Sequence, residues 1–182
     1  ALELAVQAGE RVIACASTEA KRQAARDRGA WHAIDGQDLA ATVKRLTDDH
    51  GADIVFDPVG GELFDAGVRA AAQNGQLLSI GFASGTIPKA PLNYLLVKNL
   101  TLHGFFYGRY IGWTPADERA AFAEPLQAAM ASMMEGVRRG GLRPTVAHTY
   151  EIDQLADALH ALESRQVVGK VALRIGGQDR RA

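Results

Sequence analysis

Two side chains that can bind a phosphate group stand close together near the start of the chain. Ser17 follows the apolar segment 11–16, and Lys21 lies one helical turn further on. A hydroxyl group and a cation suit a phosphate, whereas a carboxylate in their place would repel it. Taken alone, these residues favour a simpler interpretation, in which Ser17 or Thr18 caps a helix and Lys21 is a solvated surface charge.

Small and glycine-rich turns follow two further apolar segments. The segment that ends at Asp57 continues as Pro58-Val59-Gly60-Gly61, and the segment 77–81 continues as Phe82-Ala83-Ser84-Gly85. Glycine lets the backbone approach a ligand closely, and small residues leave room for a flat ring. The alternatives are that Pro and Gly only make a turn, and that 82–91 is a plain surface loop.

Metal-binding and nucleophilic arrangements are not visible in the sequence. The histidines, at positions 32, 50, 103, 148 and 160, do not stand at metal-ligand spacing with one another or with Cys15. No Ser-His-Asp or Cys-His arrangement stands out either. We therefore predict no metal ligand and name no catalytic residue. Tyr107 is better explained by packing or by an interface than by a place in an active site.

Short apolar segments alternate with helical segments along the chain. Strands are predicted over 11–16, 31–34, 53–57, 77–81, 100–106, 145–150 and 167–175. Helices are predicted over 1–9, 18–28, 39–49, 61–72, 92–98, 115–137 and 154–163. Asn74-Gly75 is the expected stop of the fourth helix, and Pro115 lies in the first turn of the longest one.

Repeated strand–helix–strand units predict an α/β fold, a doubly wound parallel sheet with helices on both faces. Ligands of such sheets bind at the carboxyl ends of the strands. Ser17, the turn after Asp57 and the loop that begins at Phe82 all follow predicted strands. The residues that could bind a ligand therefore stand where this fold binds ligands.

Composition limits the classes of function. The chain has 182 residues, of which 47% are hydrophobic and 23% charged, as in globular domains and unlike disordered ones. Lys and Arg number 20 and Asp and Glu 21, so bulk charge does not favour nucleic acid or anionic membranes. No apolar run reaches the ~18 residues of a membrane span. We expect a soluble, cytoplasmic protein that binds neither nucleic acid nor membrane.

Several segments together resemble the medium-chain dehydrogenase/reductase superfamily. They are residues 11–14 with Ser17 and Lys21, then 29–35, 51–61, 75–81 and 169–173. The match is strongest to the zinc-independent quinone oxidoreductase branch, which includes zeta-crystallin-like proteins. Residues 51–61 followed by 75–81 are the most specific pair, and the resemblance covers nearly the whole chain in order.

The resemblance implies a longer parent protein with a substrate lobe, a Rossmann domain and a return to the first lobe. We expect residues 1–136 to form an NADP(H)-binding Rossmann domain and residues 137–182 to be the return segment. The first Rossmann strand and its Gly-rich phosphate loop are then expected immediately before Ala1. Because that strand is central in the family's sheet, we expect a gap between the strands 11–16 and 53–57.

The resemblance also implies NADPH as the cofactor and assigns residues to it. Ser17 and Lys21 would hold the 2′-phosphate. The nicotinamide end would be contacted by Pro58, Val59, Gly60, Phe82, Ala83 and Ser84. A C-terminal segment that reaches back to the cofactor would contribute Arg165, Gly169 and Lys170. One position departs from the family, because Gly36 beside Asp35 stands where a Tyr often contacts the adenosine end.

The function implied by the resemblance is hydride transfer from NADPH to a quinone or an α,β-unsaturated carbonyl. The chain by itself is expected to be inactive. The family forms homodimers through the strand that corresponds to 100–110, which we expect here unless Trp113 and the long helix cover that edge. The alternatives are a zinc-dependent alcohol dehydrogenase of the same superfamily, a non-enzymatic nucleotide-binding protein and a methyltransferase, whose cofactor favours an acidic residue where Ser17 stands.

Overall fold

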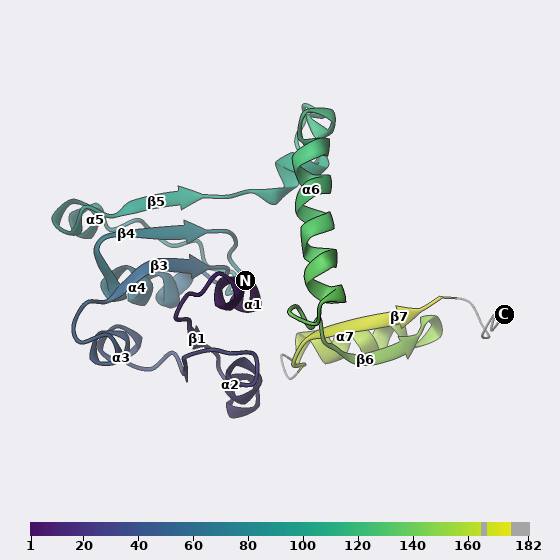
Figure 1. Ribbon diagram of the computed structural model, residues 1–182, viewed down its shortest axis with the longest axis horizontal. Coiled ribbons are helices and arrows are strands. Elements are labelled where there is room, and N and C mark those ends of the chain that lie inside the picture. Colours follow the sequence, from purple (N-terminus) through teal and green to yellow (C-terminus); the bar gives the residue numbers. More distant parts are fainter. Residues whose placement is uncertain (165–166, 176–182) are drawn as a thin grey trace.

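The computed structural model describes residues 1–164 and 167–175 and confirms the alternation of strands and helices (Figure 1). In chain order the helices and strands are α1 (Leu2–Gln7), β1 (Ile13–Cys15), α2 (Glu19–Arg26), β2 (His32–Ile34), α3 (Leu39–Leu46), β3 (Ala52–Asp57), α4 (Gly61–Ala70), β4 (Ala71–Ser79), α5 (Leu92–Lys98), β5 (Thr101–Gly104), the 3-10 helix η1 (Tyr107–Ile111), α6 (Arg119–Arg138), β6 (Val146–Glu151), the 3-10 helix η2 (Ile152–Gln154), α7 (Leu155–Glu163) and β7 (Lys170–Arg174).

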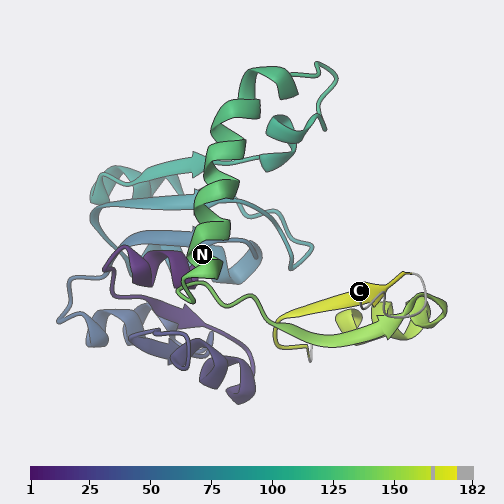
Figure 2. The ribbon, with the colours of Figure 1, turned by 45° about the vertical axis from the view of Figure 1, so that its right-hand side comes forward.

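The paired strands are parallel, as predicted, and form separate sheets. β1 pairs with β2, β3–β4–β5 form a second sheet, and β6 pairs with β7. In the described part of the chain no ladder joins β1 to β3, so the sheet is interrupted at the expected place. Figure 1 shows α6 between the three-stranded sheet and the β6–α7–β7 unit, and Figure 2 shows that unit set apart from the other sheets.

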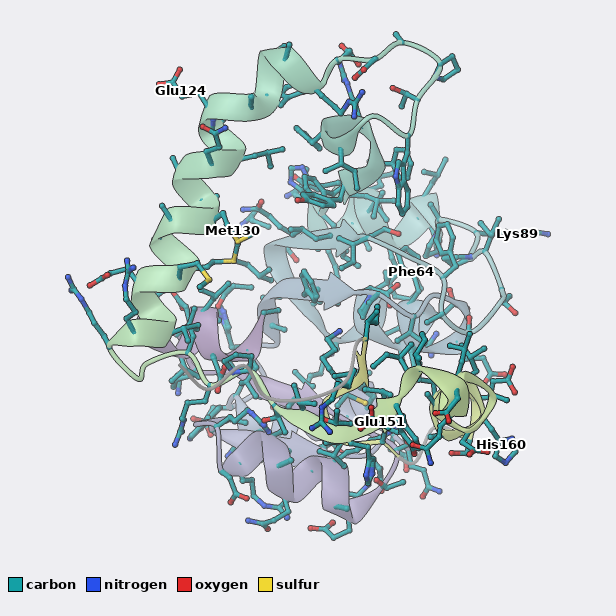
Figure 3. The ribbon with its side chains drawn as sticks, turned by 90° about the vertical axis from the view of Figure 1, so that its right-hand side faces the viewer. Phe64, Lys89, Glu124, Met130, Glu151 and His160 are labelled. Carbon is teal, nitrogen blue, oxygen red and sulfur yellow. The ribbon has the colours of Figure 1, made fainter. Side chains whose placement is uncertain are left out.

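The main core lies between α4 and the β3–β4–β5 sheet. Its buried residues are Phe64, Val68, Ala71, Leu77 and Leu100. Phe64 and Val68 stand four residues apart and therefore share one face of α4, and Figure 3 shows Phe64 inside the body of the protein. Burial of each large apolar side chain contributes about 1.5–3 kcal/mol. This core fixes β3 and β4, whose carboxyl ends carry two of the predicted ligand-binding loops.

The end of α4 differs from the prediction based on Asn74-Gly75. The helix ends at Ala70, and β4 runs on through the predicted stop. Lys98 of α5 donates hydrogen bonds to three carbonyl oxygens around this end, those of Val68, Arg69 and Ala71, at 3.3, 2.8 and 2.7 Å. Carbonyl groups at a helix end lack partners within the helix. A lysine from a different helix therefore satisfies the end of α4, which local sequence signals do not reveal.

The start of α6 also differs from the prediction. The helix begins at Arg119, so Pro115 lies before it, and Pro125 lies inside it. Asp117 accepts a hydrogen bond from the backbone N–H of Arg119 at 3.1 Å. Such an aspartate turn holds the chain out of helical geometry before the first turn. The longest helix is therefore four residues shorter at its start than the proline pattern indicates.

Candidate cofactor site

The turn after β3 is organised by the carboxylate of Asp57. This side chain is buried, with 6% of the residue exposed. Its Oδ1 atom accepts hydrogen bonds from the backbone N–H groups of Val59 and Gly60 at 2.9 and 3.0 Å, and Oδ2 accepts from Gly60 at 3.2 Å. The carboxylate thus satisfies the N–H groups of the two residues that precede α4 and fixes the backbone that enters this helix.

The turn after β3 and the loop after β4 are joined by backbone hydrogen bonds. Ala83 N–H donates to the carbonyl of Pro58 at 3.1 Å, and Ser84 N–H donates to that of Val59 at 3.0 Å. Gly61 N–H in turn donates to the carbonyl of Thr86 at 3.1 Å. The structure therefore brings together the predicted nicotinamide-end residues, which come from two loops about 25 positions apart in the sequence.

At Gly60 these two loops approach so closely that a side chain would not fit. Its φ is 71° and its ψ is −160°, a conformation open essentially to glycine only. A Cβ atom at this position would lie 2.8 Å from the carbonyl oxygen of Thr86 and 3.0 Å from the Phe82 ring. Phe82 itself is 43% exposed, so its ring is open to solvent beside the turn. Gly60 thus lies against the backbone of the second loop and beside a partly exposed aromatic ring.

The candidate phosphate ligands stand at the beginning of α2. Thr18 is the N-cap residue and accepts a hydrogen bond from the backbone N–H of Lys21 at 3.3 Å. Thr18 thus takes the capping role, and Ser17 lies exposed just outside the helix, with no hydrogen bond from its hydroxyl among the described residues. Lys21 lies in the first turn and is half-buried. The capping alternative therefore accounts for Thr18 and leaves Ser17 available.

Arg22 is a cation at this place that the sequence reasoning missed. Its Nη1 atom donates to the carbonyl of Ala16, directly after β1, at 3.0 Å, and its Nε atom donates to Glu19 at 2.9 Å. Hydrogen bonds from Arg26 and then from Arg22 lower the pKa of Glu19. The Arg22 side chain is only 18% exposed. The sequence signal for Arg22 was its position directly after Lys21. Two adjacent basic residues at the start of a helix are unusual, because the helix dipole disfavours positive charge there.

The end of β2 brings a negative charge to the same region. The pKa of the Cys15 thiol is raised mainly by desolvation and to a smaller extent by the negative charge of Asp35. The positive charge of Arg22 lowers this pKa. Asp35 also accepts a hydrogen bond from the N–H of Gln37 at 3.0 Å across the turn that contains Gly36. The departure from the family at Gly36 therefore leaves a small turn, held by an aspartate, where a larger aromatic residue was expected.

The C-terminal candidates lie in different surroundings. Arg165 falls outside the described residues. Gly169 precedes β7, and the N–H of Lys170 donates to the carbonyl of Thr145 at 2.8 Å. Thr145 in turn accepts a hydrogen bond from Arg28, just beyond the end of α2. That is the opposite end of α2 from the candidate phosphate ligands, so the structure does not bring Gly169 and Lys170 together with the other candidates.

A pocket of about 330 Å³ lies elsewhere, among α3, α4 and α5. It is lined by Ala40, Ala41, Lys44, Arg69, Tyr94 and Lys98. The three cations stand in the last turns of their helices, and in a strand–helix–strand unit this is the side opposite the carboxyl ends of the strands. None of the predicted site residues lines this pocket, so Lys44 offers a cation remote from the candidate cofactor site.

Metal-binding clusters and membrane-spanning helices are both absent from the part of the chain that the structure describes. Among residues 1–164 and 167–175, no three His, Cys, Asp or Glu side chains lie close enough together to hold a metal ion. Within the same ranges, no helix combines the length and apolar character needed to cross a bilayer.

Tyr107 begins η1 beyond β5, and its ring stacks on Tyr110 with centroids 6.4 Å apart. This contact fits the packing role expected for Tyr107.

Comparison with known sequences identifies the family. The zinc-binding dehydrogenase profile matches residues 1–141. The chain belongs to this family. It is 32% identical over 168 residues to a quinone oxidoreductase-like protein 2 homolog from Nematostella vectensis, a match that covers 91% of this chain and 44% of that protein. The predicted resemblance is confirmed, and the chain spans less than half the length of this relative.

Solved structures with the same fold include a protein named for its use of NAD and a protein in complex with NADPH. An NAD-dependent alcohol dehydrogenase superposes with a TM-score of 0.76 at 27% identity, covering 96% of this chain and 47% of that chain. A mycobacterial protein in complex with NADPH superposes with a TM-score of 0.80 at 25% identity, covering 96% of this chain and 52% of that one. The fold of this family member is therefore shared with about half of each neighbour.

Proposed function

We propose that this chain is the cofactor-binding part of an oxidoreductase and that a nicotinamide dinucleotide lies across the carboxyl ends of its strands. The observation that carries the proposal is the joined pair of loops after β3 and β4, in which Pro58 and Val59 accept hydrogen bonds from Ala83 and Ser84. Parallel α/β sheets bind ligands at this edge. Similarity to one protein named for NAD and one solved with NADPH supports the same assignment.

The two loops position the nicotinamide end in this proposal. A bound nicotinamide supplies the hydride, and the protein contributes binding and orientation. Gly60 provides the close backbone approach, and the exposed Phe82 ring provides an apolar edge. The backbone hydrogen bonds between the loops fix both surfaces relative to each other. The chain thereby limits the orientations of a flat ring through backbone groups and an aromatic side chain.

We further propose that the cofactor is NADPH rather than NADH. Ser17 lies exposed at the tip of β1, Lys21 stands in the first turn of α2, and Arg22 adds a second cation beside the carbonyl of Ala16. Charge-assisted hydrogen bonds from such groups favour a phosphate strongly over a hydroxyl. Asp35 opposes this preference through its negative charge near Cys15. The preference for NADPH over NADH therefore depends on the positive charges of Lys21 and Arg22.

Binding of NADPH and NADH to the intact polypeptide tests both proposals. We expect Lys21→Gln to weaken NADPH binding about tenfold, which corresponds to one charge-assisted contact, and to leave NADH binding nearly unchanged. Lys44→Gln removes the same charge in the remote basic pocket and should change neither affinity. Equal affinities for both nucleotides, insensitive to Lys21, would refute the preference for NADPH. Binding of neither nucleotide would refute the cofactor site itself.

We propose a quinone or an α,β-unsaturated carbonyl as the hydride acceptor of the whole protein. The support is the naming of the relatives, including the Nematostella protein. Similarity to an alcohol dehydrogenase favours alcohol oxidation as the second candidate. Oxidation of NADPH by 1,4-benzoquinone, compared with reduction of NADP by simple alcohols, separates the two. Turnover that is lost on chelation and restored by zinc would favour the alcohol dehydrogenase.

We also propose that two copies associate through β5. This strand is an edge of the β3–β4–β5 sheet, and Leu102, Phe105 and Phe106 are 36%, 44% and 58% exposed along it and beyond it. Trp113 is 73% exposed, whereas Tyr110 stacks on Phe105 and meets Phe122 of α6 edge-on. η1 and α6 therefore cover part of this segment and leave Leu102 and Phe106 exposed. An open apolar edge strand favours pairing with another chain. The support is thus an unpaired edge together with an apolar surface.

Sedimentation velocity of the intact polypeptide tests this association. Phe106→Lys should shift the protein from dimer to monomer. Glu124→Gln changes the charge by the same one unit on α6, where the side chain projects outward (Figure 3), and should leave the dimer intact. A monomeric wild-type protein, or a dimer that persists in Phe106→Lys, would refute the role of β5.

A further inference from the structure

Asp57 is unusual because its charge is buried without a cation beside it. Among the residues that the structure describes, Asp57 is the single charged residue that is buried. No ion pair within the described residues includes it. Burial of a carboxylate is unfavourable unless hydrogen bonds replace its lost water. Here the replacement comes from the backbone N–H groups of Val59 and Gly60, between 2.9 and 3.2 Å away.

The same short segment carries hydrogen bonds in two directions. The N–H groups of Val59 and Gly60 point inward to Asp57, whereas the carbonyls of Pro58 and Val59 accept from Ala83 and Ser84 of the other loop. A peptide unit is planar, so fixing an N–H direction also fixes the carbonyl of the preceding residue. The N–H of Val59 and the carbonyl of Pro58 belong to one such unit. The N–H of Gly60 and the carbonyl of Val59 belong to the next.

We infer that Asp57 is a positioning residue that sets the loop after β4 through these two peptide units. The inference rests on the proposed cofactor site and adds to it the residue that holds its two loops in register. Every residue from Phe82 to Ile87 is exposed, so packing contributes little to this loop. Among the described residues, the remaining hydrogen bond between this loop and the turn runs from the Gly61 N–H to the Thr86 carbonyl. Loss of the Asp57 carboxylate therefore releases the part of the loop that includes Ala83 and Ser84.

A role in positioning makes a different prediction from a role in stability alone. The core contacts of α4 come from Phe64 and Val68, further along the helix, and do not include Asp57. The turn can therefore change orientation while the core of the sheet remains packed. A residue that only stabilises the fold would change exchange of backbone amides throughout β3 and β4. A positioning residue changes exchange mainly in the loop around Ala83 and Ser84.

Hydrogen exchange and cofactor binding of the intact polypeptide test the inference together. In Asp57→Ala we expect amide exchange in the 82–86 loop to accelerate at least tenfold, while β3 and β4 retain their protection, and NADPH affinity to fall about tenfold. Asp57→Asn keeps one acceptor oxygen and should give intermediate values for both. Asp53→Ala, at the other end of β3, where the side chain is exposed and pairs with His50, is the matched control and should change neither.

The possible results separate this inference from the proposed function. Uniformly faster exchange across β3, β4 and the loop, with no selective effect in 82–86, would overturn the positioning role. If Asp57→Ala does not fold, the same comparison is made with Asp57→Asn, and an unchanged 82–86 loop there would overturn it as well. If the wild-type protein binds no nicotinamide nucleotide, the cofactor proposal fails. Selective loop exchange in Asp57→Ala would then still support the control of the loop by Asp57.

Discussion

Replacement of Gly60 by alanine tests the close approach of the two loops most directly. The backbone at Gly60, with φ 71° and ψ −160°, costs a residue with a side chain about 1–3 kcal/mol. The added Cβ would also lie 2.8 Å from the Thr86 carbonyl oxygen. This neighbour is backbone, so no side-chain rotation relieves the overlap, and the loop after β4 must move at a further cost of about 1–3 kcal/mol.

Gly85→Ala is the matched control for this change. Gly85 also has a positive φ, 81°, but a Cβ there would meet nothing within 4 Å. It therefore carries the cost of the backbone conformation, about 1–2 kcal/mol, without the overlap. The difference between the two variants therefore combines the overlap with the Thr86 carbonyl and the extended ψ of Gly60. We expect Gly60→Ala to be the less stable by at least about 1 kcal/mol.

Urea unfolding followed by circular dichroism gives the stability difference, and fluorescence titration with NADPH gives the functional one. Gly60→Ala should weaken NADPH binding more than Gly85→Ala, because only the first moves the loop relative to Pro58 and Val59. Equal stabilities and equal affinities for the two variants would show that the approach of the loops is not a constraint. The joined loops after β3 and β4 would then not form the nicotinamide end of the site.

Three further changes test other parts of the structure. Leu77→Ala empties a fully buried core position and should reduce the free energy of unfolding by about 2–5 kcal/mol in urea titrations, and a loss below 1 kcal/mol would contradict the core described. Hydrogen bonds from the Arg119 side chain lower the pKa of Asp117 to about 2; its contribution to stability is complete above the ordinary value of 3.8 and is lost as the pH falls toward 2, so an NMR titration midpoint near 3.8 would refute the pairing. Asp35→Asn removes a charge that raises the pKa of Cys15, so iodoacetamide should react faster with Cys15 at pH 8, and an unchanged rate would exclude this coupling.

Sequence patterns predicted the elements better than their ends. Apolar runs and glycines located the strands and helices, because burial and backbone conformation are read from a few neighbouring residues. The end of α4 was wrong because Lys98, 28 positions beyond Ala70 and on a different helix, satisfies its last carbonyls. The start of α6 was wrong because Asp117 folds back on the N–H of Arg119, a competitor that the Pro115 pattern hid.

The proximity of some candidate residues could be predicted from the sequence, and that of others could not, for the same reason. Proximity of the loops after β3 and β4 follows from the order of parallel strands, so their meeting could be predicted from the fold. The hydrogen bond from Ala83 N–H to the Pro58 carbonyl could not be predicted, because it depends on the register of two strands. Arg22 was missed because its contact with the Ala16 carbonyl needs the geometry of the turn between β1 and α2.

The two groups of candidate residues lie on sheets that the described chain leaves unpaired. Lys21 and Arg22 depend on the local β1–α2 turn, whereas Pro58, Val59 and the 82–86 loop depend on the core between α4 and β4. A ligand that contacts both groups adds a connection between β1–β2 and β3–β4–β5 that the hydrogen bonds of the chain do not supply. Binding to the folded state stabilises a protein by mass action. For a dinucleotide that spans the two sheets, this stabilisation would include a tighter association of the sheets themselves.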